Sequence, residues 1–408
     1  MDHHDFIVVN EFINDEELMI DADSEEDEDF NALLTMMNEN REIINVASVI
    51  INNGNESGEE IINALHCTRN NKFVKSDHYY KEVIPLFGDK QFQCHFRMKK
   101  ETYMVLENLL RPSISDSNKN NLPLKKKILL TIWIISTLET FRSVADRFGV
   151  SKTTAYEAFK EVIFTLKILM PNFIQWPDAE KRNESTKIFQ LRSRGFPGVV
   201  GAIDGSHIAI KQPPLNANDY YNRKDYHSII LQAICDEKGK FIDILIGRPG
   251  RAHDAAVFRS SEIYKKLTDK DNPLLPHDQH ILGDSAYPLL QSLMTPFKDH
   301  GNLSPAENDY NTRHASIRSV IERAFALLKG KWRRLKYLDI RSVEMGNVIV
   351  AAACTLHNFL IMNDEINISE RFNFNSNDML REEIEEHTQE VPVTAQIKRN
   401  LIKNLLTS

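Results

Sequence analysis

Residues 198–210 read GVVGAIDGSHIAI and place one carboxylate, that of Asp204, inside an otherwise apolar stretch. The residues before Asp204 are typical of a buried β-strand, and the residues after it resume the apolar character. An isolated charge is costly to bury unless it is paired with an opposite charge or bound to a metal ion. Both the fold and the chemistry of the chain therefore depend on which group pairs with Asp204.

The composition is that of a globular protein. The chain has 408 residues, of which 42% are hydrophobic, and this length suits two or three domains. Its longest apolar run, residues 128–135, is far shorter than the roughly 20 residues that span a membrane. The acidic N-terminus lacks the basic region of a secretory signal, and the four cysteines form no metal-binding pair. We therefore expect an intracellular protein without a membrane span.

Charge is distributed unevenly, because residues 1–65 form an acidic leader that we expect to be weakly ordered. Residues 1–60 carry 18 acidic side chains and one basic side chain, whereas the remainder carries 40 acidic and 49 basic side chains. Crowded like charges oppose a compact state, although residues 42–51 are apolar enough for a short helix. The leader is either a solvated tail or a cover for a basic surface. The basic remainder suits a polyanionic partner, but the excess is too small to identify one.

Residues 66–176 have the periodicity of a helical region. Apolar residues at helical spacing predict one helix at 99–110 and another at 122–138. This region precedes the strand-rich part of the chain and is assigned to a separate, all-α part.

Within the helical region, residues 140–163 predict two helices joined by a turn at Gly149, with Thr140 and Ser151 as N-caps. The second helix would expose small polar and basic residues at its start, as a helix-turn-helix does when it enters the major groove of DNA. The candidate DNA contacts are Lys152, Thr153 and Thr154. The alternative is a plain helical hairpin with no DNA-binding role.

After residue 197 the pattern changes to short strands that alternate with helices, which predicts a mixed α/β layer fold. The expected strands are 198–204, 207–212, 228–235, 239–247 and one that begins at 280 and ends at a turn at Gly283 and Asp284; the expected helices are 254–267, one beginning at Pro288, 311–332 and 345–361. We assign residues 186–361 to this domain and residues 362–408 to a polar, peripheral tail.

Three carboxylates are spaced so that such a fold could bring them together. Asp204 and Asp284 each end an expected strand, and strand ends at one edge of an α/β sheet lie close in space. Glu322 shares a polar stripe of the long helix with His314 and Arg318. Converging carboxylates repel one another, and Mg²⁺ or Mn²⁺, which prefers oxygen ligands, removes that repulsion. Two such ions about 3.5–4 Å apart can clamp the attacking and leaving oxygens of a phosphodiester displacement.

Each acidic residue also has a structural interpretation. Asp204 and Asp284 could begin turns, and Glu322 could form an ordinary helical ion pair with Arg318. Asp254, in the stretch GRPGRAHDAAVF at 247–258, could cap the following helix or could be a fourth metal ligand in the same cleft.

A basic segment lies close to Glu322 and could neutralise DNA phosphates. The candidate contacts are Arg318, Lys329, Lys331, Arg333 and Arg334. Trp332 lies among them and could stack on a base, although core packing is the default for a tryptophan.

Six motifs follow one another between residues 197 and 361. They read VVGAIDGSHIAI, YYNRKDYHSIILQAICD, GRPGRAHDAAVFRSS, LGDSAYPLL, IRSVIERAFALLKGKWRRL and AACTLHNFLI. Together they resemble the DDE-superfamily endonuclease domain of PIF/Harbinger transposases and of the nucleases derived from them. The resemblance implies an RNase H-like fold and a divalent-metal nuclease site made by Asp204, Asp284 and Glu322, with Asp254 as a further metal ligand. It also implies work in the nucleus and a separate Myb-like partner protein that assists DNA recognition.

The leading hypothesis is therefore a metal-dependent DNA endonuclease that hydrolyses phosphodiesters by a two-metal mechanism. One alternative is a domesticated DNA-binding or scaffolding protein that no longer cuts. Another is an unrelated metal phosphoesterase, which would act on small phosphate esters and would show no salt-sensitive DNA binding.

Overall fold

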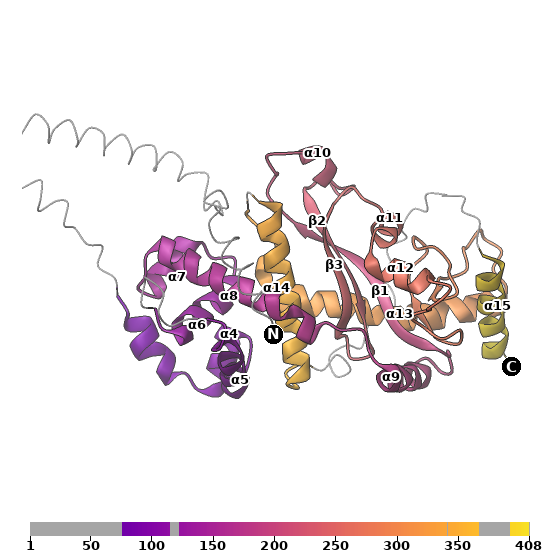
Figure 1. Ribbon diagram of the computed structural model, residues 1–408, viewed down its shortest axis with the longest axis horizontal. Coiled ribbons are helices and arrows are strands. Elements are labelled where there is room, and N and C mark those ends of the chain that lie inside the picture. Colours follow the sequence, from indigo (N-terminus) through magenta and orange to yellow (C-terminus); the bar gives the residue numbers. More distant parts are fainter. Residues whose placement is uncertain (1–75, 115–121, 341, 367–391, 408) are drawn as a thin grey trace, which may run out of the picture. The chain divides into compact units, whose positions relative to one another are not determined.

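The computed structural model describes residues 76–114, 122–340, 342–366 and 392–407 (Figure 1). The acidic leader expected at residues 1–65, with its short helix at 42–51, lies outside the described residues. The described chain divides into two compact units, a larger one made of residues 88–138 and 158–407 and a smaller one made of residues 76–87 and 139–157.

The smaller unit consists of short helical segments whose aromatic side chains pack together. It contains η1 (Tyr79–Val83), η2 (Ile84–Leu86), α7 (Phe141–Arg147) and the start of α8 (Lys152–Phe173). The ring of Tyr79 packs edge-on against the rings of Phe87 and Phe148.

The turn between α7 and α8 has the local geometry that the sequence predicts. The Thr140 hydroxyl accepts a hydrogen bond from the backbone N–H of Ser143 at 3.2 Å, and the Ser151 hydroxyl accepts one from Thr154 at 3.0 Å. Gly149 has φ = 61°, in the left-handed region that glycine adopts without strain. These contacts account for two capped helices and a tight turn, whereas DNA binding by the start of α8 stays a prediction.

The larger unit begins with three helices, α4 (Asp89–Phe96), α5 (Lys100–Leu110) and α6 (Leu124–Ser136). The last two confirm the helices predicted at 99–110 and 122–138. α6 is buried along nearly its whole length, and its Lys127 forms an ion pair with Glu161 of α8 at 2.8 Å. This partner offsets the cost of burying the ammonium group.

A mixed five-stranded sheet in the order β3-β2-β1-β4-β5 lies at the centre of the larger unit, and it confirms the mixed α/β class. The strands are β1 (Val199–Ala209), β2 (Ser228–Cys235), β3 (Phe241–Pro249), β4 (His280–Leu282) and β5 (Leu293–Met294). β2 is antiparallel to both β1 and β3, whereas β4 runs parallel to β1 and β5 parallel to β4. β1 is therefore a central strand with a partner on each side.

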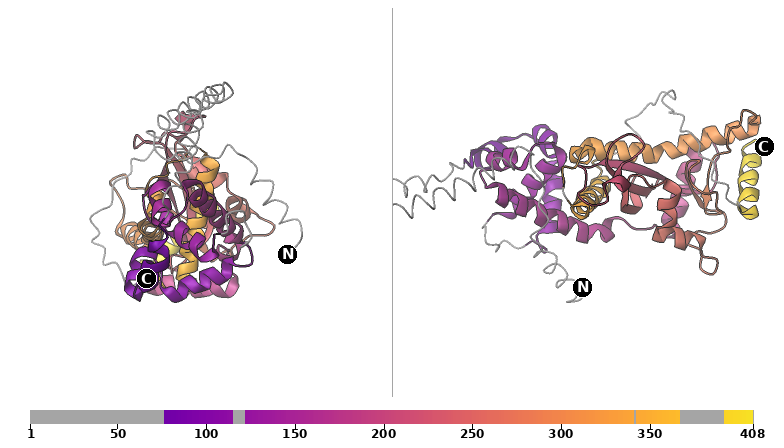
Figure 2. Two further views of the ribbon diagram at one scale, coloured as in Figure 1. Left: turned by 90° about the vertical axis from the view of Figure 1, so that its left-hand side faces the viewer. Right: turned by 90° about the horizontal axis from the view of Figure 1, so that it is seen from above.

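Helices pack on both faces of this sheet (Figures 1 and 2). On one face, Ile203 and Ile242 share an apolar cluster with Phe258 and Ile263, which lie on α11 (Asp254–Arg259) and α12 (Glu262–Thr268). On the other face, the ring of Phe241 packs against Phe325 and His357, which lie on α13 (Pro305–Lys331) and α14 (Val343–Met362). Side chains that alternate along β1 consequently face different helices.

α14 is the one helix among the described residues that is long and apolar enough to cross a membrane. Of its apolar stretch, 89% is buried inside the protein, against β3 and α13, as in the core helix of a globular domain.

Several elements differ from the sequence prediction. β1 is one strand rather than two, so that Asp204 lies in its middle and not at its end. The helix expected at 254–267 is divided into α11 and α12 by a break at which the Ser261 hydroxyl accepts from the N–H of Tyr264 at 3.1 Å. No helix begins at Pro288, because the chain there leads directly into β5. α9 (Ala179–Arg192) was not predicted, because it is mostly polar and buries only Ser185 and Phe189.

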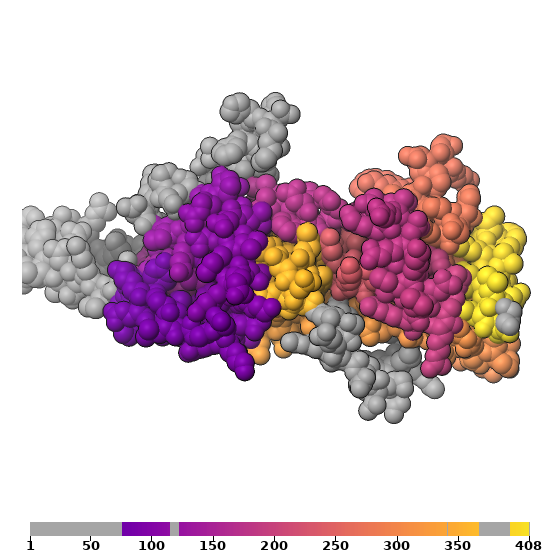
Figure 3. Space-filling view, turned by 90° about the horizontal axis from the view of Figure 1, so that it is seen from below, coloured from indigo at the N-terminus to yellow at the C-terminus, as the bar shows by residue number. Residues whose placement is uncertain are grey.

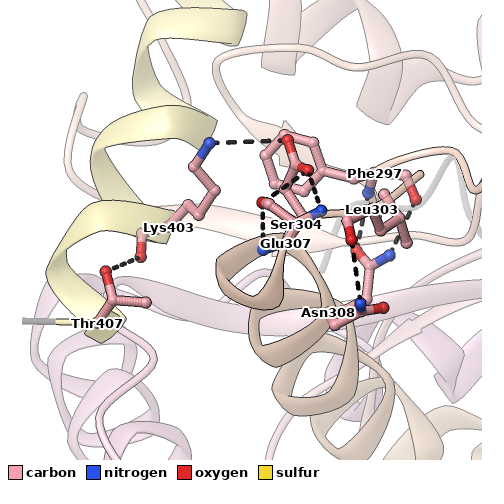
Figure 4. A network of polar contacts seen from close by, with 8 residues as sticks. Phe297, Leu303, Ser304, Glu307, Asn308, Lys403 and Thr407 are labelled. Carbon is pink, nitrogen blue, oxygen red and sulfur yellow. Dashed lines mark hydrogen bonds and ion pairs between the residues drawn. The ribbon is translucent and has the colours of Figure 1, made fainter.

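The C-terminal segment is not a peripheral tail throughout, because α15 (Val393–Thr407) packs against the start of α13 (Figures 3 and 4). The ammonium group of Lys403 lies 3.7 Å from the carboxylate of Glu307, which also belongs to the capping box of α13. Lys398 donates hydrogen bonds to the backbone oxygens of Gln279 at 2.8 Å and Gln291 at 2.7 Å. Residues 393–407 therefore belong to the folded larger unit.

We predict that α15 contributes measurably to stability through its buried face. Replacing Ile402, which is 5% exposed, with Ala should lower the free energy of unfolding by about 2–4 kcal/mol, because it removes buried methyl groups and leaves a cavity. Replacing Ile397, which lies on the same helix but is 53% exposed, should change it by less than about 0.5 kcal/mol. Chemical denaturation of the two variants measures the difference. Equal effects would mean that α15 does not dock as described.

Candidate functional site

Asp204 lies in the middle of β1, with its backbone paired to Ala233 of β2. Its side chain is 18% exposed and points to the face of the sheet that α13 covers. Burial raises the pKa of Asp204 to about 7; the Arg318 guanidinium opposes the shift, and the carboxylates of Asp284 and Asp254 add to it. The charge that the sequence places inside an apolar strand is thus paired with an arginine.

Asp284 comes two residues after the end of β4, the strand that runs parallel to β1. Its carboxylate accepts a hydrogen bond from the backbone N–H of Ala286 at 3.0 Å. Burial raises the pKa of Asp284; the positive charge of Arg318 lowers it, and the nearby carboxylate of Glu322 raises it further. The adjacency of the two parallel strands therefore brings Asp284 within electrostatic range of Asp204, as the sequence predicts.

Asp254 is the first residue of α11. Its carboxylate approaches Asp204 from the other face of the sheet. The N-cap of the helix is His253, one residue earlier than the position predicted for Asp254. A Cβ placed on Gly205 would lie only 2.2 Å from Oδ1 of Asp254. The glycine that follows Asp204 is thus required because it leaves space for the Asp254 carboxylate.

Glu322 and Arg318 lie one turn apart on α13. Nη1 of Arg318 lies 3.3 Å from Oδ2 of Asp204, and Nη2 of the same guanidinium donates to Oε1 of Glu322. Glu322 is half exposed, so the group of carboxylates opens to solvent on this side. His314 does not belong to a polar stripe, because it is 2% exposed and bonds the backbone oxygen of Met294. Burial lowers the pKa of His314 to about 4, so it is neutral at pH 7.

The sequence reasoning missed two residues beneath the carboxylates. Tyr287 is 4% exposed, and its hydroxyl accepts a hydrogen bond from the amide of Gln232 on β2 at 3.2 Å. Burial raises the pKa of Tyr287, and the negative charges of Asp254, Asp204 and Asp284 raise it further. Its position three residues after Asp284 was the available sequence signal.

The predicted DNA contacts on and after α13 occupy different environments. Lys329 is largely buried: its ammonium group donates to the backbone oxygen of His207 on β1 at 2.7 Å, and burial lowers its pKa to about 8. Arg334 lies on η3 (Arg333–Lys336) and donates to the backbone oxygen of Ile134 on α6 at 3.2 Å. These two bonds connect parts of the larger unit, and DNA binding by Lys329 and Arg334 stays a prediction. Trp332 is fully buried, as its default interpretation requires.

The remaining predicted contacts stay accessible. Arg333 is exposed and Lys331 is partly exposed, and Arg333 lies close enough to Arg97 to lower the pKa of that guanidinium, after burial of Arg97 itself. Lys152, Thr153 and Thr154 lie at the start of α8 in the smaller unit and are exposed or partly exposed. A basic residue that the sequence analysis did not select, Lys224, lies near Lys329 and lowers its pKa further.

The side chains that meet at β1 offer the type of donor atom that a hard divalent cation prefers. They are carboxylate oxygens, which Mg²⁺ and Mn²⁺ prefer, and the space at Gly205 lets Asp254 approach β1 closely. In the described parts of the chain, no three His, Cys, Asp or Glu side chains form a ready-made metal-binding group. The positive charge among the carboxylates is instead the guanidinium of Arg318. Metal binding would thus require the Arg318 guanidinium and the carboxylates around it to rearrange.

Comparison with known proteins defines the class of the larger unit. Residues 203–358 match the family model of the DDE superfamily endonuclease, which includes all four acidic residues of the site. Residues 77–167 match a second family, described as a domain of unknown function. No solved structure matches the chain.

The chain is also similar in sequence to several curated proteins. The chain is 29% identical to "Putative nuclease HARBI1" of Rattus norvegicus over 279 residues, which cover 66% of this chain and 77% of that protein. It is 33% identical to the Homo sapiens protein of the same name over 218 residues, covering 53% and 61%. It is 25% identical to "Protein ALP1-like" of Arabidopsis thaliana over 291 residues, covering 67% and 71%. Over about two thirds of its length the chain thus resembles Harbinger transposase-derived proteins, in agreement with its motifs.

Proposed function

We propose that this protein is a divalent-metal-dependent DNA endonuclease whose catalytic domain has an RNase H-like fold. The observation that carries the proposal is the convergence of Asp204, Asp284 and Glu322 on one guanidinium, with Asp254 close to Asp204, within the segment that matches the endonuclease family. A purely structural ion pair needs one carboxylate, whereas this site gathers four. An excess of negative charge in a partly buried site is typical of a functional rather than a structural group.

The acidic residues of the site would hold the metal, and two buried residues would position them. Asp204, Asp284 and Glu322 would hold the divalent ion, Mg²⁺ or Mn²⁺, and Asp254 would complete the donor set from the other face of β1. When bound, such ions supply an activated water and stabilise the charge on the attacked phosphate, in the two-metal arrangement described for nucleases. The Tyr287–Gln232 hydrogen bond, buried beneath, would limit the movement of the loop after β4.

DNA would approach the half-exposed side of the site, where Glu322 lies. Lys331 and Arg333 are accessible and would neutralise backbone phosphates, and Arg318 would do so once it no longer pairs with Asp204. Lys329 and Arg334 would add positive charge near the DNA, although both side chains are hydrogen-bonded to backbone oxygens. Lys152, Thr153 and Thr154 at the start of α8 would read the DNA site. These roles, a nuclear location and a Myb-like partner protein are parts of the proposal.

Cleavage of supercoiled plasmid by the purified full-length chain tests this function. We expect nicked and linear product with Mn²⁺ or Mg²⁺ and no product with EDTA. Cleavage that persists in EDTA would contradict a metal-dependent mechanism.

A domesticated DNA-binding or scaffolding protein without cleavage activity is the second candidate. It is favoured by the absence of a ready-made metal-binding group in the described residues and by the name of the "Protein ALP1-like" relative, which states no nuclease activity. This candidate requires DNA binding that weakens with salt but no product under any metal condition. Repeating the plasmid assay with a candidate Myb-like protein separates it from an enzyme that lacks its partner.

A further inference from the structure

The Arg318 guanidinium lies between two carboxylates of the site, those of Asp204 and Glu322. Nη1 of its guanidinium lies 3.3 Å from Oδ2 of Asp204, and Nη2 donates to Oε1 of Glu322. The side chain is 22% exposed, so the contacts are shielded from water more than those of a surface ion pair. One guanidinium thus bridges a carboxylate of the sheet and a carboxylate of α13.

Arg318 is also the main positive charge that acts on the site. Its guanidinium contacts the carboxylates of Asp204 and Glu322 at once. The carboxylate of Asp254 also lies close to this part of β1, against Gly205. Without Arg318, several negative charges would face one another in a partly buried site, which costs free energy.

The helix geometry makes this contact part of the fold. Arg318 and Glu322 are four residues apart on α13, so their side chains lie on one face of the helix. α13 itself is fixed by its buried face against β1 and β2, and its first turn is fixed by α15. The guanidinium can consequently turn away from Asp204 while the helix stays in place.

We propose that Arg318 is a built-in counter-cation of the metal-free site, which a divalent ion must displace from Asp204 and Glu322 in order to bind. This inference rests on the proposed metal site and deepens it, because it assigns to one residue the control of metal affinity. The protein can then fold without metal, since the guanidinium offsets part of the repulsion among the carboxylates. Metal and guanidinium compete for the same oxygens, so binding of one weakens the contacts of the other.

Direct measurement of Mn²⁺ binding tests this competition without reference to cleavage. Full-length wild type, Arg318→Met and Arg318→Lys are titrated with Mn²⁺ at pH 8, with free Mn²⁺ measured by electron paramagnetic resonance. We expect Arg318→Met to bind Mn²⁺ roughly ten- to a hundred-fold more tightly, because the ion no longer has to break charge-assisted hydrogen bonds. Arg318→Lys, which keeps a positive charge, should stay within a few-fold of wild type. The metal-free Arg318→Met protein should also melt at a lower temperature than wild type, and Mn²⁺ should remove that difference.

Arg111→Met is the matched control, because Arg111 forms a helical ion pair with Glu107 four residues away on α5 but has no contact with the site. It should change neither Mn²⁺ affinity nor the effect of Mn²⁺ on melting. Unchanged or weaker Mn²⁺ binding by Arg318→Met would overturn the proposal. If wild type binds no Mn²⁺ but Arg318→Met does, the counter-cation role is supported and the metal-dependent activity of the natural chain is not. If neither binds Mn²⁺, both the inference and the proposed metal site fail.

Discussion

Asp204→Asn is expected to reduce metal-dependent DNA cleavage more than about a hundredfold, since even indirect partners of metal ligands contribute 10- to 100-fold. The substitution keeps the shape of the side chain but removes the negative charge that pairs with Arg318. Because β1 is held by β2 on one side and by β4 on the other, the strand should stay in register. The effect should therefore fall on the chemistry and not on the fold. Initial rates of plasmid nicking at saturating Mn²⁺ measure it.

Asp243→Asn is the control for this substitution. Asp243 lies on β3 of the same sheet, and burial raises its pKa to about 6, as it also raises the pKa of Asp204. It is not among the charges that act on Asp204 or Asp284. The control should cleave within a few-fold of wild type, and cleavage by Asp204→Asn at the wild-type rate would contradict the assignment of the site.

Gly205→Ala should lower cleavage by about a hundredfold, the scale expected when a reacting group is misplaced by about 1 Å. The new methyl group would lie 2.2 Å from Oδ1 of Asp254, so the Asp254 carboxylate has to rotate away from β1. Gly205 pairs with Gln232 in the sheet, and alanine is compatible with this extended backbone. We therefore expect a folded protein with a disturbed donor set. Nicking rates, together with far-ultraviolet circular dichroism, measure the two properties separately.

Gly330→Ala provides the matching control for this change. Gly330 lies on α13, and a Cβ there would meet no atom within 4 Å. Alanine at this position should leave cleavage unchanged and should slightly favour the helix. Equal loss of cleavage in both glycine variants would show that the Asp254 carboxylate is not held against Gly205.

Long, uniform patterns in the sequence predicted their elements well. The largely apolar segment at 228–235 became β2 with the same limits, because a strand buried along its whole length needs mostly apolar side chains. The helix predicted at 311–332 also formed, but it begins at Pro305, because Ser304 and Glu307 make a capping box that the apolar periodicity does not record.

The sequence pattern was less informative where long-range contacts decide the structure. Polar residues in the middle of β1 indicated a break, but pairing with β2 from Ala202 to Ala209 keeps β1 continuous, and Arg318 compensates Asp204 from 114 residues away. α15 was missed because its role depends on contacts with the distant start of α13. The acidic residues of the site could be selected from the sequence, since charge within or after apolar strands is rare. The role of Gly205 could not, because it follows from a contact with Asp254 on another element.

Anomalous diffraction from crystals grown with Mn²⁺ would locate the metal ion directly. We expect an anomalous peak at the carboxylate oxygens of Asp204 and Asp284, with the Arg318 guanidinium turned away from Asp204. A map at millimolar Mn²⁺ without such a peak, in which Arg318 still pairs with Asp204 and Glu322, would contradict it.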